Sequence, residues 1–93
     1  MEVRAGNLSL DPTSRRVRFR DVTARLTRRQ ARLLSFLIEA SPRPYTPEEL
    51  LRQVWGYAPH TGLKSLVRSH VYNVRKKLGA DSILSRPGWG YYV

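Results

Sequence analysis

The chain has 93 residues, and its 17 lysines and arginines against 7 acids give a formal net charge of +10 at pH 7. A chain of this length forms one hydrophobic core, so we expect a single domain over residues 1–93. It has no cysteine, which excludes disulfides and thiolate metal sites and permits a cytoplasmic location. So many cations on a small domain favour a polyanionic partner, above all nucleic acid. An anionic membrane surface is the rival, but the apolar residues are needed for the core.

The sequence offers no recognisable catalytic or metal-binding constellation. Its acids are scattered, and the adjacent pair Glu48 and Glu49 is explained by the chemistry of a helix start. His60 and His70 do not form a metal pair at their spacing. We therefore expect no enzyme activity, no cofactor and no metal.

Residues 1–26 carry the alternation of half-buried strands. Leu8 and Leu10 are followed by Val17 and Phe19, with turn residues between the two pairs. We expect an antiparallel sheet of about four strands here. Arginines crowd this segment: Arg15, Arg16, Arg18 and Arg20. They would face DNA, a neighbouring copy or a regulatory domain, and the sequence does not choose between these.

Residues 27–78 predict three helices. A capping box from Thr27 to Gln30 starts the first helix, which runs to about Ala40. The second starts at Thr46, with a proline and two glutamates in its first turn, and stops at Gly56. The third begins near Leu63 or Lys64 and runs to Leu78.

The third helix is amphipathic and basic. Its predicted inner face holds Leu63, Leu66, Val67, His70, Val71, Val74 and Leu78. Its predicted outer face holds Ser65, Arg68, Ser69, Tyr72 and Lys76. From Arg52 to Lys77 there are six basic residues and no acid, which favours a nucleic-acid contact over a solvated face of mixed charge.

Residues 82–93 predict a β-hairpin, with strand runs at 82–85 and 91–93 around a tip that contains glycine. A sheet, three helices and a hairpin in this order define an α+β fold.

The local strings Leu26–Gln30, Glu48–Tyr57, Val67–Leu78 and Gly88–Tyr91 stand in the order and spacing of a known family. From Gly6 to Val93 the chain resembles the winged helix-turn-helix effector domain of OmpR/PhoB-type response regulators, the C-terminal part of these transcriptional regulatory proteins. The resemblance implies that helix 64–78 enters the major groove of promoter DNA and that the hairpin is a wing. Family members bind as head-to-tail pairs, under a receiver domain phosphorylated in a two-component phosphorelay. That receiver is absent from these residues.

Residue chemistry then suggests roles within the third helix. Arg68 and Asn73 are the best base-contacting residues, because arginine suits guanine and asparagine suits adenine. Ser65, Ser69 and Tyr72 are further candidates for base contacts. The expected phosphate contacts are Lys64, Arg75, Lys76 and Lys77. We expect His70 to be a core histidine with a satisfied ring; the resemblance adds a phosphate contact at its edge, and another from the indole of Trp55.

Two further contacts are expected outside the helix. On the wing, residues 85–91 would lie near the minor groove, through Arg86, Gly88 and Trp89; the alternative for Arg86 is an exposed hairpin arginine. Resemblance alone assigns an RNA polymerase contact to the loop residues Tyr57, Ala58, Pro59, His60 and Thr61. Two alternative functions stay open: a basic RNA-binding module, and a winged helix used only for protein contacts.

Overall fold

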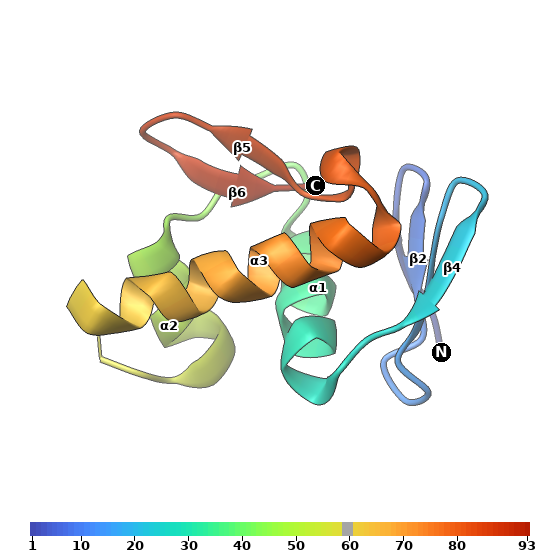
Figure 1. Cartoon of the computed structure of the whole chain (residues 1–93), viewed down its shortest axis with the longest axis horizontal. Helices are drawn as coiled ribbons and strands as arrows, with labels where there is room; N and C mark the ends of the chain where they lie inside the picture. The colour runs from blue at the N-terminus through green and yellow to red at the C-terminus, as the bar shows by residue number, and fades with distance from the viewer. Residues whose placement is uncertain (59–60) are drawn as a thin grey trace.

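The computed structural model describes residues 1–58 and 62–93 in full, and residue 61 by its backbone. Four strands come first, then three α-helices, then a two-stranded hairpin, so the predicted order is confirmed (Figure 1). In the part of the chain that the structure describes, no helix combines the length and the apolar character needed to cross a membrane.

The N-terminal sheet is antiparallel, and its strands are ordered as in the sequence. The strands are β1 (Val3–Ala5), β2 (Leu8–Leu10), β3 (Arg16–Phe19) and β4 (Val22–Arg25). Leu10 pairs with Val17 and Leu8 with Phe19, and all four side chains are buried, as the alternation predicts. The sequence patterns did not locate β1, which is only three residues long.

The three helices begin and end close to the predicted residues: α1 (Arg28–Ala40), α2 (Pro47–Trp55) and α3 (Lys64–Leu78). Thr27 forms the expected capping box with Gln30, and Thr46 forms a second one with Glu49. Gly56 ends α2 in the left-handed conformation, at φ 71°. Short 3₁₀ turns at Thr61–Leu63 and Ala80–Ser82 were not predicted.

Helix α3 crosses the front of the molecule, with α1 and α2 behind it, the hairpin along one side and the sheet near its C-terminal end (Figure 1). One buried cluster joins these parts, and its α3 members are Val67, Val71, Val74 and Leu78. Leucines of α1 and α2 form the centre of this cluster, including the fully buried Leu33, Leu34, Leu37, Leu50 and Leu51.

The hairpin is formed by β5 (Leu84–Arg86) and β6 (Gly90–Tyr92), slightly displaced from the expected runs. The displacement arises because Ser82 is buried in a 3₁₀ turn, where its hydroxyl donates to the carbonyl of Gly79 at 2.7 Å. An isolated bridge joins Tyr45 and Tyr91 through two backbone hydrogen bonds of 2.9 and 2.8 Å. The segment before α2 therefore extends the hairpin into the body of the domain.

Gly90 makes this bridge possible, and we predict that Gly90→Ala severely destabilises the chain. Its φ is +110°, and an added Cβ would collide with the carbonyl group of Tyr45. Gly88→Ala is the matched control, because Gly88 has φ +80° but open space around it. In urea unfolding, Gly88→Ala should lower the free energy of unfolding by about 1–2 kcal/mol, because alanine is strained in the left-handed conformation. Gly90→Ala should lower it clearly more. Equal decreases in the two variants would contradict the collision with Tyr45.

Candidate nucleic-acid interface

The outer face of α3 is open to solvent. The predicted outer residues Ser65, Arg68, Ser69, Tyr72 and Lys76 are all exposed. Tyr72 stands out among them, since 63% of its surface is accessible. Of the seven predicted inner residues, four are buried (Val67, Val71, Val74 and Leu78) and three are half-buried (Leu63, Leu66 and His70), which confirms the predicted orientation of the helix.

The side chains of Asn73 and Ser65 are less free to contact a ligand than those of the other candidates for base contacts. Asn73 lies half-buried at the edge of the outer face. The hydroxyl of Ser65 donates to the carbonyl of Gly62 at 3.1 Å, at the start of the helix. Arg68 makes no such contact within the described residues, which leaves its guanidinium free to approach a ligand.

The hairpin tip stands beside this helix face. Arg86, Gly88 and Trp89 are exposed, and the guanidinium of Arg86 lies 5.1 Å from the centre of the Trp89 ring. Arg68 and Arg86 line one hollow of about 410 Å³ between α3, the hairpin and the start of α2. The fold thus places a cation of the helix and a cation of the tip on the same side of the molecule.

Two of the expected phosphate contacts have acceptors inside the chain. Arg75 donates to the carbonyl of Ile83 and to the hydroxyl of Ser85, both at 2.8 Å. Lys77 donates to the carbonyl of Arg25 at 3.0 Å and to the side chain of Gln30 at 2.9 Å. Both side chains therefore hold α3 to its neighbours.

Lys64 and Lys76 differ in their surroundings. The ammonium of Lys64 lies 3.5 Å from the carboxylate of Glu48, which the fold brings to α3 from the start of α2. Although the sequence has no acid between Arg52 and Lys77, the fold places the negative charge of Glu48 beside this basic segment. Lys76 is exposed and makes no ion pair among the residues that the structure describes.

Trp55 and His70 form an aromatic pair where α2 ends against α3, with ring centres 5.4 Å apart. The indole nitrogen of Trp55 and both ring nitrogens of His70 are buried without a hydrogen-bond partner in the described part of the chain. The expectation of a satisfied histidine ring is therefore wrong: its apolar position on α3 removes the ring from solvent without supplying an acceptor or donor.

Burial lowers the pKa of His70, and the positive charge of Arg29 on α1 lowers that pKa further. Sequence reasoning did not select Arg29 as a site residue. The residue flanks a capping box, and only the packing of α1 on α3 brings its charge near the imidazole. A neutral imidazole carries one N–H, so the pair holds two buried donors without partners, the indole N–H of Trp55 and one N–H of His70, near the positive charge of Arg29.

The loop expected to contact RNA polymerase is described in part. Tyr57 and Ala58 are exposed directly after α2. Pro59, His60 and the side chain of Thr61 lie outside the described residues.

Comparison with known proteins gives consistent results. The family model for "Transcriptional regulatory protein, C terminal" matches residues 21–93. The transcriptional regulatory protein VxrB of Vibrio cholerae is 38% identical over 90 residues, which cover 97% of this chain and 36% of that protein. The regulatory protein VanRB of Enterococcus faecalis is 36% identical over 90 residues, covering 97% of this chain and 40% of that protein.

Among solved structures, the fold matches the DNA-binding domain of Klebsiella pneumoniae RstA in complex with the RstA box. The TM-score is 0.77 at 23% identity, and the match covers 98% of this chain and 94% of that one. The chain spans less than half the length of the two curated relatives. The match to RstA supports the winged-helix fold.

We predict that His70 makes the chain less stable in mild acid. The folded pKa of His70 is below its ordinary value near 6.5, so the unfolded chain binds more protons between these two values. The stabilisation that the neutral ring of His70 gives to the folded chain is complete above its ordinary pKa. It is lost as the pH falls toward the lower pKa of the folded state. The free energy of unfolding should therefore fall as the pH drops below about 6.5.

His70→Gln removes the titrating group and should flatten this pH dependence relative to the parent chain, because the other titrating groups cancel in the difference. Arg29→Gln should reduce the slope partly, since it removes the smaller cause of the lowered pKa. An unchanged slope in His70→Gln would show that another group is responsible.

Proposed function

The chain belongs to the family of C-terminal domains of transcriptional regulatory proteins, the winged-helix effector domains of the OmpR/PhoB type, and from this premise we propose that it binds specific sequences in double-stranded DNA. Helix α3 enters the major groove, and residues 85–91 of the wing lie near the minor groove. The observation that carries the proposal is the open, basic outer face of α3 on the same side as the exposed Arg86.

Specificity is assigned to the middle of α3. Arg68 is exposed and lacks an intramolecular partner among the described residues, so its guanidinium can bind guanine through two hydrogen bonds. Asn73 contacts adenine from the edge of the helix, and Tyr72, Ser65 and Ser69 contact bases or the adjoining backbone. Family members often carry an acidic residue at the position of Arg68 and arginine at that of Asn73, so the preferred sequence differs from theirs.

Affinity is assigned to cations and buried donors around the helix. Lys76 neutralises a phosphate directly. Lys64 does so by exchanging its ion pair with Glu48 for a phosphate contact. The indole N–H of Trp55 and the single N–H of the neutral His70 ring donate to a phosphate near Arg29 once contact with the duplex exposes these two buried groups. Arg75 and Lys77 act first by holding the wing and the sheet, and contribute to the field around the duplex.

On the wing, Arg86 inserts toward the minor groove while Gly88 and Trp89 shape the tip. We assign the loop 57–61 to contact with RNA polymerase, and two copies to head-to-tail binding on direct repeats. A regulatory domain of the receiver type would control this binding, and such a promoter-bound regulator acts in the cytoplasm. The resemblance to the family supports these partners, and the two curated relatives are longer than this chain.

Selection of bound duplexes from a random pool tests the proposal directly. We expect a recurring motif, and binding to it that weakens steeply with salt. Each neutralised phosphate should add about 0.9 to the log–log salt slope. A competing single-stranded RNA should bind more weakly. Binding without a motif, or a preference for RNA, would overturn the promoter assignment in favour of an RNA-binding module.

We predict that Arg68→Ala lowers affinity for the selected motif by about 1–3 kcal/mol and affects random DNA less. Asn73→Ala should behave in the same way. Lys76→Ala is the matched control from the same face: it should weaken binding to all duplexes alike and lower the salt slope by about one unit. Fluorescence anisotropy against both duplexes measures the difference. If Arg68→Ala lowered the affinity for both duplexes equally, Arg68 would not be a base-contacting residue.

A further inference from the structure

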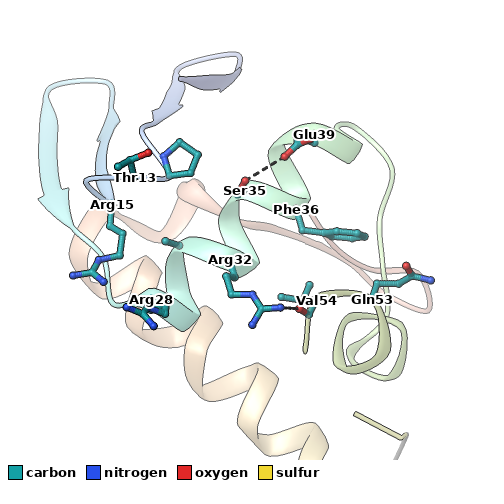
Figure 2. A pocket seen from close by; sticks show the side chains of 11 residues that line it. Thr13, Arg15, Arg28, Arg32, Ser35, Phe36, Glu39, Gln53 and Val54 are labelled. Carbon is teal, nitrogen blue, oxygen red and sulfur yellow. Dashed lines mark hydrogen bonds between the residues drawn. The ribbon is translucent and has the colours of Figure 1, made fainter. Parts of the chain in front are cut away.

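A second basic surface lies away from α3, on the outer side of α1. It is a groove of about 380 Å³ between α1, the turn after β2 and the end of α2 (Figure 2). The residues that line it include Arg15, Arg28, Arg32, Phe36, Glu39 and Val54. We call this surface the α1 groove.

The α1 groove follows one stripe of the helix. Arg28, Arg32, Ser35 and Glu39 are spaced by four, three and four residues, which places them on one face. The opposite face, with Leu33 and Leu37, is buried in the core. Helix α1 lies behind α3 in Figure 1, and the residues of this stripe are distinct from the exposed residues of α3, so the α1 groove is a separate surface.

The cations of the α1 groove lack counter-charges. Figure 2 shows Arg15 and Arg28 at one end and Glu39 at the other. Neither arginine forms an ion pair within the described residues, and the Nε of Arg15 is buried there without an acceptor. Because the Nε of Arg15 is shielded from solvent, the groups open to an incoming anion are the terminal N–H groups of Arg15 and those of the exposed Arg28.

The two other charged groups of the α1 groove are already engaged. Arg32 donates to the carbonyl of Val54 at 2.7 Å, at the end of α2. The carboxylate of Glu39 accepts from the hydroxyl of Ser35 at 3.3 Å. The open anion position is therefore the end formed by Arg15 and Arg28.

Between these ends the floor is apolar. Phe36 is half-buried and packs edge-on against Tyr45, with ring centres 4.9 Å apart. Ala31 and Val54 complete the floor. A phosphodiester backbone has nothing to place on such a floor, whereas a peptide can set a carboxylate on the arginines and an apolar side chain on Phe36.

We propose that the α1 groove docks an acidic segment of a partner polypeptide, with a carboxylate held between Arg15 and Arg28 and an apolar side chain against Phe36. The surface adjoins the last turn of α2, just before the loop that begins at Tyr57. A partner seated there would contact the regulator while DNA occupies α3. The proposal goes beyond DNA binding and does not depend on it.

The test is a titration of the ¹⁵N-labelled chain with a capped hexapeptide of sequence Asp-Glu-Leu-Asp-Glu-Phe. We expect amide shifts to concentrate in residues 28–36 and at Val54, with weak affinity. The amide peptide Asn-Gln-Leu-Asn-Gln-Phe is the neutral control and should not bind. Arg28→Gln should weaken peptide binding by about tenfold, since a charge-assisted contact is lost. Arg18→Gln removes one charge from the exposed face of the sheet and should leave binding unchanged.

Binding of the selected DNA duplex keeps the two proposals distinguishable, because Arg28→Gln should leave it unchanged. Shifts confined to α3 and the wing would overturn the docking proposal, since the peptide would then merely mimic a polyanion. Equal binding of the neutral peptide, or no binding at millimolar peptide, would also overturn it. Arg15→Gln should weaken peptide binding as Arg28→Gln does. If this variant fails to fold, Arg15→Lys keeps the charge and should still weaken binding, because it lacks the planar guanidinium that binds a carboxylate through two hydrogen bonds.

Discussion

The domain depends on the burial of one side of α3. Val67, Val71, Val74 and Leu78 recur at helical spacing and enter the core shared with α1 and α2. Once these side chains are buried, the helix cannot rotate, and the polar residues between them must point outward. The orientation of the candidate interface is thus a consequence of core packing and needs no contact from the ligand.

The same helix fixes the position of the other two parts of the molecule. Arg75 reaches Ile83 and Ser85 at the base of the wing, and Lys77 reaches Arg25 at the end of the sheet. Two cations of the last turn of α3 thus hold helix, wing and sheet together. This arrangement withdraws two charges from direct contact with a ligand, but it gives the wing tip a defined position beside Arg68.

Features with a local cause could be predicted from the sequence. The capping residues Thr27 and Thr46, the stop at Gly56 and the amphipathic pattern of α3 follow from near neighbours, and all are present. Features that depend on distant neighbours could not be predicted. The pairing of Lys64 with Glu48, the charge of Arg29 near His70 and the inward use of Arg75 require the tertiary fold. Strand β1 was missed because none of its three residues is fully buried, whereas β2, of the same length, buries Leu8 and Leu10.

The high net charge of the chain is divided between surfaces that face different ways. The molecule measures 35 × 25 × 21 Å, so charges at distant points of its surface are separated by more than the Debye length of about 8 Å at physiological salt. Under these conditions a duplex on α3 and an anion in the α1 groove interact weakly through solvent. At low ionic strength the screening length grows, and a negatively charged ligand on either surface lowers the positive potential felt at the other. The cations at the two surfaces are different residues, so the proposed duplex and the proposed acidic peptide do not compete for the same arginine or lysine.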